Sequence, residues 1–269
     1  MVAFPHCKIN LGLNIVSKRA DGFHNIETCF YPIPRMDILE IIPFQEFSFV
    51  QTGIDVPGLQ DDNLCVKAYQ LLKNDFQMGN VKMHLHKIIP MGAGLGGGSS
   101  DAAFVLRLLN SVFDLKLSLE SLKKYAAQLG SDCSFFIEDV PQIGTGRGEI
   151  LSPTSSYLSG LHLVLTKPDI HVSSAEAYSG IVPHQAEFPI TEILKLPVSE
   201  WRGKLKNDFE KSIFKKYPLI SQLKEKMYSS GAAYASMSGS GSSVFGLFEK
   251  QVELKKEFSG VDYWSGELK

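Results

Sequence analysis

Apolar and polar residues alternate near the start of the chain, over residues 8–15. A period of two is typical of a strand that buries one face. The pattern therefore predicts a half-buried strand whose second face is polar. The apolar face carries Ile9, Leu11, Leu13 and Ile15, and the polar face carries Lys8, Asn10, Gly12 and Asn14.

Similar patterns predict further elements in the first half of the chain. Strands are expected over residues 37–42 and 46–51, which a hairpin at residues 43–45 could join, and over residues 81–85. Helices are expected where apolar residues recur every three or four positions behind a capping side chain. They cover residues up to 73 behind Asp62 or Asn63, residues 102–112, and residues up to 129 behind Ser118, with Gly130 ending the last.

Similar patterns predict the elements of the second half of the chain. A strand is predicted over residues 161–166, helices over 174–181, 204–216 and 218–229, and a turn of small residues over 237–243 that runs into an apolar segment at 244–248. Because strands and helices do not alternate strictly, the pattern favours an α+β fold over a doubly wound sheet. The Ser/Pro-rich residues 152–156 indicate a boundary between two lobes, 1–152 and 153–269.

Composition narrows the class of protein. The chain has 269 residues, 44% hydrophobic and 21% charged, with a net charge of −2. These values are ordinary for a globular protein and predict neither nucleic-acid nor membrane binding. We expect a cytoplasmic protein, because the sequence shows neither a signal peptide nor a long apolar run. Four scattered cysteines, without a C-x-x-C pair, argue against a disulfide framework or a zinc site.

A glycine-rich loop before the helix predicted at residues 102–112 carries the clearest chemical signal. Residues 92–98 contain five glycines, and two serines follow. Glycines let the backbone approach a ligand closely, and a helix N-terminus directs free N–H groups at one point. The loop therefore predicts a phosphate site. Its residues are Pro90, Met91, Gly92, Ala93, Gly94, Leu95, Gly96, Gly97, Gly98, Ser99 and Ser100.

Two familiar loop types fit this segment poorly. The dinucleotide fingerprint is formally present, but Pro90 breaks the junction with the strand, and Lys116 stands where a ribose-binding acid belongs. A Walker A loop would need a lysine just before Ser99 or Ser100. A ligand-free mobile turn is also disfavoured, because the loop runs straight into an amphipathic helix. The remaining interpretation is a loop that wraps phosphates with backbone donors and takes its cations from elsewhere.

These residues carry a family resemblance. Residues 90–100 resemble the second motif of the GHMP kinases, residues 8–11 the first and residues 238–242 the third. Residues 19–24 (Arg-Ala-Asp-Gly-Phe-His) resemble a segment of the 4-diphosphocytidyl-2-C-methylerythritol kinase family. So do residues 62–64, 130–132, 146–151 and 207–210, so that the resemblance covers essentially the whole chain.

The resemblance implies a fold and a reaction. The fold has an N-terminal lobe like ribosomal protein S5 domain 2 and an α/β C-terminal lobe. The reaction phosphorylates the 2-hydroxyl of a cytidine diphosphate-linked methylerythritol, with ATP as donor and Mg²⁺ as cofactor, in the non-mevalonate isoprenoid pathway. The partner is then a small molecule, and we expect a monomer or weak homodimer.

The resemblance also assigns a catalytic pair. Lys8 would draw charge from the transferring phosphoryl group, and Asp132 would accept the proton of the substrate hydroxyl. Without the resemblance, Lys8 reads as a surface lysine and Asp132 as a helix N-cap.

The binding residues follow by the same route. Asn63, Leu64 and Lys87 would line the adenine pocket, and Ser99 and Ser100 would meet phosphate or Mg²⁺. Phe23 would stack on cytosine with Tyr178 on its other side, and His24 would bond the edge of the base. Asn10, Ser240 and Gly241 complete the predicted substrate site.

Several features leave alternatives open. Cys7, Ser131, Cys133 and Ser134 depart from the family pattern near the predicted catalytic pair. His84 and His86 share a strand face, where solvation is a better interpretation than zinc binding. A mevalonate- or homoserine-type kinase, an NAD-binding oxidoreductase and a non-catalytic nucleotide-binding module are the competing functions.

Overall fold

The computed structural model describes residues 1–154 and 158–268. Its contacts divide the chain into two compact units, each assembled from several segments. Unit 1 contains Met1–Lys8, Arg35–Met91 and Gly96–Asp139, and unit 2 contains Ile9–Pro34, Gly92–Leu95 and Val140–Lys269. The division at residue 152 stays a prediction, and residues 155 and 156 of its Ser/Pro-rich stretch lie outside the described residues.

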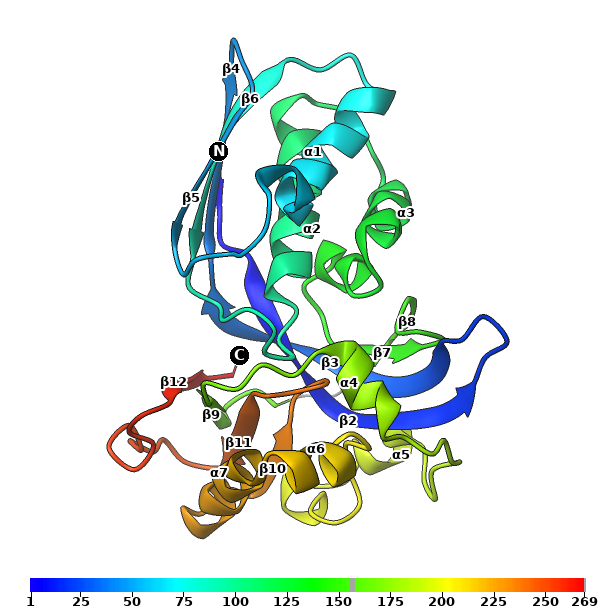
Figure 1. Cartoon of the computed structure of the whole chain (residues 1–269), viewed down its shortest axis with the longest axis vertical. Helices are drawn as coiled ribbons and strands as arrows, with labels where there is room; N and C mark the ends of the chain where they lie inside the picture. Colours follow the sequence, from blue (N-terminus) through cyan, green and yellow to red (C-terminus); the bar gives the residue numbers. More distant parts are fainter. Residues whose placement is uncertain (155–157, 269) are drawn as a thin grey trace. The chain divides into compact units, whose positions relative to one another are not determined.

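Unit 1 has a four-stranded sheet with helices on one face (Figure 1). The strand order is β1 (Val2–Ala3), β4 (Ile38–Phe44), β6 (Asn80–Lys87) and β5 (Ser48–Gly53). The three longer strands confirm the sequence predictions, but the hairpin at residues 43–45 was wrong. Strand β6 lies between β4 and β5, antiparallel to the first and parallel to the second. A parallel partner needs a longer crossover, which helix α1 supplies.

The helices of unit 1 begin at their predicted caps, with one exception. Asn63 accepts a hydrogen bond from the Cys65 N–H at 2.9 Å, and Ser118 accepts one from Ser121 at 3.2 Å. Helix α2, however, begins at Gly97 rather than Ala102, because a run of glycines hid its first turn. The elements are η1 (Gln60–Asp62), α1 (Leu64–Asp75), α2 (Gly97–Val112), α3 (Leu119–Leu129) and η2 (Cys133–Ile137).

A second sheet is built on two long strands that pass through both units. Its order is β2 (His6–Lys18), β3 (His24–Met36), β7 (Gln142–Thr145) and β8 (Ile150–Pro153). The expectation of a half-buried β2 was wrong, since Lys8, Asn10 and Asn14 are only 3, 2 and 7% exposed. Strand β3 escaped prediction because Pro32 and Pro34 interrupt its pattern. The polar face of β2 is therefore held inside the protein.

The third sheet and its helices belong to unit 2. The sheet is antiparallel throughout, in the order β10 (Tyr234–Met237), β11 (Val244–Phe248), β9 (His162–Lys167) and β12 (Asp262–Glu267). Buried side chains of α7, including Leu223 and Met227, pack in one core with Val244 and Phe248 of β11. The helices are α4 (Ser174–Ser179), α5 (Ile190–Ile193), η3 (Val198–Glu200), α6 (Glu210–Lys216) and α7 (Pro218–Ser229).

One predicted helix of unit 2 is much shorter than expected. The pattern over residues 204–216 yields α6 only from Glu210. Asn207 explains the late start, because its side chain accepts from the Phe209 N–H at 3.0 Å. It also donates at 2.8 Å to the carbonyls of Met237 and Gly239. A side chain that bonds nearby backbone in this way competes with helix formation.

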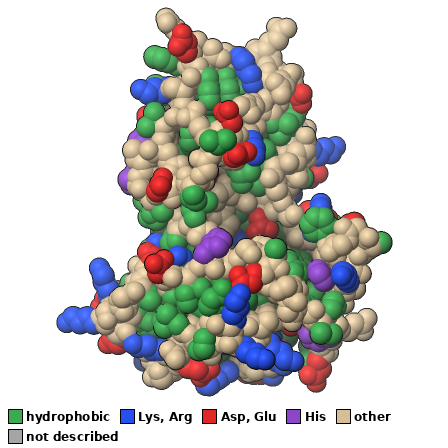
Figure 2. Space-filling view, viewed as in Figure 1, with side chains coloured by type: hydrophobic (Ala, Val, Ile, Leu, Met, Phe, Trp, Pro, Cys, Tyr) green, Lys and Arg blue, Asp and Glu red, His purple; other side chains and the backbone are tan. Residues whose placement is uncertain are grey.

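The surface and the thiols agree with the composition. Lys and Arg side chains are interspersed with Asp and Glu over the face shown in Figure 2. Among the described residues, no helix is both long and apolar enough to cross a membrane. Cys7, Cys29, Cys65 and Cys133 are free and buried in the structure.

Candidate active site

Strand β2 and the turn before η2 bring Lys8 and Asp132 together within unit 1. The Lys8 Nζ lies 3.7 Å from the Asp132 Oδ2. The lysine side chain is 4% exposed, whereas the aspartate side chain is 35% exposed. Asp132 occupies the N-cap position of η2, as the helix-cap interpretation predicts, but its side chain makes no capping hydrogen bond there. The pair is thus a buried ammonium beside a carboxylate that remains open to a ligand.

Burial controls the charge of this pair. Loss of water around the ammonium lowers the pKa of Lys8 from its usual value, and the charge of Asp132 partly opposes that effect. A desolvated ammonium interacts more strongly with any negative charge that enters its surroundings. Lys8 is therefore better suited to stabilise a bound anion than to interact with bulk solvent.

The glycine-rich loop lies directly against the pair. Gly96 has a φ of +69°, and a Cβ there would come within 2.9 Å of Phe136 and 3.3 Å of the Lys8 side chain. Both its left-handed backbone and this contact require glycine. The N-terminus of α2 follows at once, where the Ser100 N–H bonds the Gly96 carbonyl at 2.9 Å. Unit 1 therefore places a helix N-terminus, with its unpaired N–H groups, next to Lys8.

The two serines of the loop lie in the first turn of α2. The Ser100 hydroxyl is buried and has no hydrogen-bond partner among the described residues. Ser99 hydrogen-bonds the thiol of Cys133, one of the departures from the family pattern. Burial raises the pKa of Cys133 to about 11 and that of Cys7 to about 12, so both stay as thiols.

Lys87 belongs to a second, fully buried charge cluster in unit 1. Its ammonium contacts Asp37 and lies 2.8 Å from Asp101, and all three side chains are at most 2% exposed. Asp37 also accepts hydrogen bonds from the backbone of Ile88 and Ile89. Although burial opposes its charge, the two carboxylates hold the pKa of Lys87 above its usual value. Burial raises the pKa of Asp101 to about 8. The charge of Lys87 is therefore already neutralised inside the protein.

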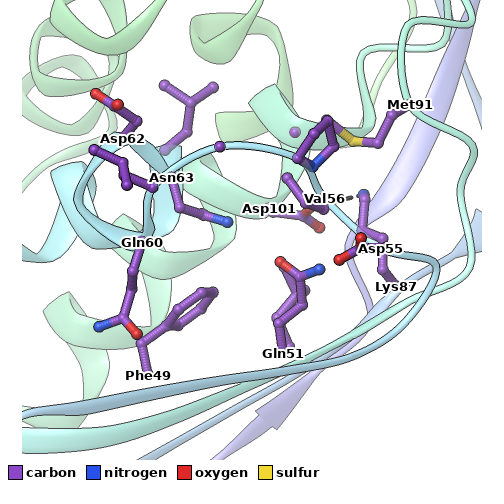
Figure 3. Close-up of a pocket in the computed structure, with 16 residues that line it drawn as sticks. Phe49, Gln51, Asp55, Val56, Gln60, Asp62, Asn63, Lys87, Met91 and Asp101 are labelled. Carbon is purple, nitrogen blue, oxygen red and sulfur yellow. Dashed lines mark hydrogen bonds and ion pairs between the residues drawn. The ribbon is translucent and has the colours of Figure 1, made fainter.

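A cavity of about 400 Å³ opens beside this cluster (Figure 3). Five residues of the predicted nucleotide site line it: Asn63, Leu64, Lys87, Met91 and Gly98. Phe49 and Gln51 rise into it from β5, opposite Gln60 and Asn63. Sequence reasoning missed Phe49, Gln51, Gln60 and Asp101. The period of two in β5, which puts Phe49 and Gln51 on one face, was the available signal.

Unit 2 brings parts of all three motifs together. The Ser238 hydroxyl donates to the Gly94 carbonyl at 2.8 Å and accepts from the Asn10 N–H at 3.3 Å. The Ser243 N–H donates to the Ala93 carbonyl at 3.2 Å. A Cβ on Gly94 would lie 1.9 Å from the Ser238 carbonyl oxygen, so this position requires glycine. The turn that carries Ser240 and Gly241 is thereby fixed against the loop.

The aromatic residues predicted to hold a base also lie in unit 2. His24 stacks on Tyr178 with ring centroids 4.9 Å apart and an interplanar angle of 14°. Phe23 is 55% exposed, and the Arg147 guanidinium lies 5.1 Å from its ring centroid. Sequence reasoning gave Arg147 no role, although it stands in one of the family-like segments. In this structure, the ring of Tyr178 therefore stacks on His24, and the two rings leave no gap for a base between them.

Comparison with known proteins decides the family. The GHMP kinases N terminal domain matches residues 63–143, and the GHMP kinases C terminal domain matches residues 194–261. A 4-diphosphocytidyl-2-C-methyl-D-erythritol kinase of Cytophaga hutchinsonii is 54% identical over 258 residues, which is 96% of each chain. The chain belongs to the 4-diphosphocytidyl-2-C-methyl-D-erythritol kinase family.

Further similarity to this family extends over the whole chain. The Bacteroides fragilis kinase of the same name is 52% identical over 274 residues, covering 100% of both chains. A crystal structure of 4-(cytidine 5'-diphospho)-2C-methyl-D-erythritol kinase has a TM-score of 0.78 and 32% identity, covering 92% of this chain and 90% of that one. The predicted α+β GHMP kinase fold is confirmed, and the NAD-binding interpretation is wrong.

Proposed function

We propose that this chain transfers the γ-phosphoryl group of ATP to the 2-hydroxyl of 4-(cytidine 5'-diphospho)-2-C-methyl-D-erythritol. The observation that carries the proposal is identity above 50% to kinases named for this substrate, over at least 96% of the chain. The reaction serves the methylerythritol phosphate route to isoprenoid precursors. Intact Lys8 and Asp132, at 3.7 Å, argue against a non-catalytic binding module.

Lys8 and Asp132 are the catalytic pair in this proposal. The substrate hydroxyl oxygen bonds to the γ-phosphorus while the bond to the bridging β,γ-oxygen breaks, and ADP leaves. Asp132 accepts the hydroxyl proton, for which its partly exposed carboxylate is accessible. Lys8 stabilises charge on the phosphoryl oxygens from a buried position. Because the transition state is loose, alignment by the pair counts for more than the basicity of Asp132.

The glycine-rich loop and the cavity of Figure 3 hold the nucleotide. Residues 90–100 wrap the phosphates with backbone N–H groups, as the N-terminus of α2 allows. Asn63, Leu64 and Lys87 border the adenine, since all three line the cavity of about 400 Å³. The side chain of Lys87 lines the cavity there and does not bind phosphate, because its ammonium forms ion pairs with Asp37 and Asp101.

The residues present also fit Mg²⁺, the cofactor expected for this reaction. Magnesium prefers oxygen donors, keeps several waters and needs few protein ligands when phosphates are present. The orphaned Ser100 hydroxyl and the partly exposed carboxylate of Asp132 supply such donors. When bound, the ion neutralises charge on the triphosphate. Ser99, Ser100 or Asp132 would hold it.

The predicted acceptor-binding residues Phe23, His24 and Tyr178 belong to unit 2. Phe23 and Tyr178 offer π-faces for cytosine, and His24 bonds its edge once it leaves the stack on Tyr178. Asn10, Ser240 and Gly241 contact the methylerythritol or its phosphates. We further propose a cytoplasmic enzyme, monomeric or weakly dimeric, without a nucleic-acid or membrane partner.

An acceptor-specificity assay tests the function. Purified protein receives ATP, Mg²⁺ and one of three acceptors: the cytidyl substrate, mevalonate or homoserine. We expect ADP release with the first alone, and ³¹P NMR that places the new phosphate on the 2-hydroxyl. Turnover of mevalonate or homoserine at a comparable rate, or none with the cytidyl substrate, would contradict the proposal.

A further inference from the structure

Unit 2 contains a second sizeable cavity, to which the proposed function gives no role. Its volume is about 770 Å³, compared with about 400 Å³ for the cavity of Figure 3. The residues that line it come from two segments, one within residues 180–184, after α4, and one within residues 206–215, which lead into α6. Both segments belong to unit 2. Cavities of this size are typical of small-molecule sites.

Backbone contacts within unit 2 hold both sides of this cavity in place. The Leu13 N–H of β2 donates to the Lys206 carbonyl at 2.8 Å, and the Asp208 N–H donates to the Leu13 carbonyl at 2.9 Å. On the other side, a Cβ on Gly180 would lie 2.7 Å from the Ser212 Cβ, so the end of α4 packs closely on α6. The cavity is therefore formed by the fold of unit 2 itself.

Three exposed lysines that line the cavity carry charge without a carboxylate partner. Lys206 precedes α6, whereas Lys211 and Lys215 are four residues apart on that helix and so share a face. Within residues 1–154 and 158–268, none of the three ammonium groups forms an ion pair with a carboxylate. Like charges at this helical spacing repel each other, and a bound anion would relieve that repulsion.

The two carboxylates that line the cavity are already engaged. Asp208 accepts a hydrogen bond from the Ile15 N–H at 2.7 Å, and it lies 3.7 Å from Nδ1 of His184. Glu210 pairs with Lys224 at 2.6 Å, and its side chain is only 13% exposed. These carboxylates therefore leave the charge of the three lysines uncompensated, and the cavity favours an anionic ligand.

We propose that this cavity binds the diphosphate group of a small molecule, with Lys206, Lys211 and Lys215 neutralising its charge. A single phosphate group carries a charge of about −1.5 to −2 at pH 7, so two linked phosphates match three ammonium groups better than one. Ile181 and Val182 offer apolar surface beside the lysines for the rest of the molecule. The competing explanation is that the three lysines only keep this surface hydrated.

Backbone-amide NMR titration with inorganic pyrophosphate tests the site. The amides of Gly180 and Ser212 report the cavity, because both residues line it. They should shift saturably in the wild type, whether or not the glycine-rich loop also responds. We expect each single Lys→Gln variant at positions 206, 211 and 215 to weaken this binding about threefold, as for an exposed ion pair, and the triple variant about thirtyfold. Orthophosphate should bind about threefold more weakly than pyrophosphate, because it pairs with fewer lysines.

The matched control is the triple variant Lys250→Gln, Lys255→Gln and Lys256→Gln. It removes the same charge from exposed lysines of unit 2 that do not line the cavity. It should bind pyrophosphate like the wild type. Equal weakening in the two triple variants would overturn the proposal, because the attraction would then come from net charge alone. The single variants give a separate measure, and wild-type affinity in all three would also overturn it.

Two further outcomes bear on the ligand and its place. Saturable shifts confined to the amides of the glycine-rich loop, without any at Gly180 and Ser212, would overturn the site. Orthophosphate that binds as tightly as pyrophosphate would overturn the assignment to a diphosphate group. The titration contains neither nucleotide nor acceptor, so its result does not depend on the proposed function.

Discussion

Unit 1 contains two lysine–carboxylate sites, one with its lysine on β2 and one with its lysine on β6, and they differ in how far their charged groups are open to a ligand. The Lys87 cluster is closed: Lys87, Asp37 and Asp101 are at most 2% exposed, and the ammonium meets both carboxylates. The Lys8 pair is half open, with 3.7 Å between the charged groups and 35% exposure at Asp132. Removing one member of a fully buried charge cluster destabilises the fold, whereas a buried ammonium beside a partly exposed carboxylate can stabilise an incoming anion.

The contrast predicts that removing the two lysines has opposite consequences. Lys8→Met should lower kcat about 10²–10³-fold, because it removes a desolvated cation from the reacting groups. Its free energy of unfolding should stay near that of the wild type, since the substitution also removes the cost of burying a charge. Coupled ADP assays and urea denaturation of the same preparation measure both. Unfolding of Lys8→Met at a urea concentration well below that of the wild type would contradict the predicted difference between the two lysines.

Lys87→Met should mainly affect stability. It leaves Asp37 and Asp101 buried without their ammonium partner, which costs about 3–5 kcal/mol of unfolding free energy. Urea denaturation at pH 7 measures the loss. The protein that stays folded at low temperature should keep kcat within about fivefold of the wild type. A lower kcat comparable to that of Lys8→Met would place Lys87 in the chemistry instead.

Gly96→Ala tests the contact that joins the loop to the half-open pair. The methyl group would press on Phe136 and the Lys8 side chain, and the φ of +69° is strained for alanine. We expect kcat to fall about tenfold, or about 1.4 kcal/mol in the activation free energy. Gly203→Ala is the control: its φ is +81°, but a Cβ there meets no atom within 4 Å. Equal loss of kcat in both variants would show that strain alone, and not contact with Lys8, causes the effect.

His6 lies two residues before Lys8 on β2. We expect the smallest of these effects, a pH-dependent change in stability, at this residue. It packs edge-on against Phe104 and Phe136, and burial lowers its pKa from the usual value of 6.5. The folded state therefore binds fewer protons than the unfolded state, and stability present above pH 6.5 is lost as pH falls below it. We expect a loss on the order of 1 kcal/mol between pH 7 and 5, absent in His6→Phe. Parallel pH profiles in both proteins would contradict this account.

Local sequence patterns were enough to place most elements of the fold. Caps at Asn63 and Ser118 and the apolar stripes behind them gave α1 and α3, because those signals act within a few residues. Strand β3 and the position of β6 between β4 and β5 depend on pairing between distant segments, which no local pattern encodes. The two prolines in β3 argued against a strand at this position, and that indication was wrong.

The candidate site shows the same difference between features that local sequence indicates and features that depend on distant segments. The motifs named Lys8 and Asp132, and the structure places them 3.7 Å apart, but their chemical roles stay predictions. Periodicity misplaced Lys8 on an exposed polar face, because it cannot show that a second layer covers that face. The closed cluster of Lys87 and the lysine-lined cavity of unit 2 were invisible, since each arises only when separate segments meet.

Single-turnover phosphoryl transfer by Asp132→Asn tests the role of the half-open pair most directly. Enzyme in excess over the acceptor, at a concentration that binds all of it, and with saturating ATP, reports the chemical step without binding or product release. The account predicts a rate about 10²–10⁴-fold below the wild type, with the melting temperature unchanged. Transfer at the wild-type rate would contradict it, because the carboxylate beside Lys8 would then take no part in the reaction.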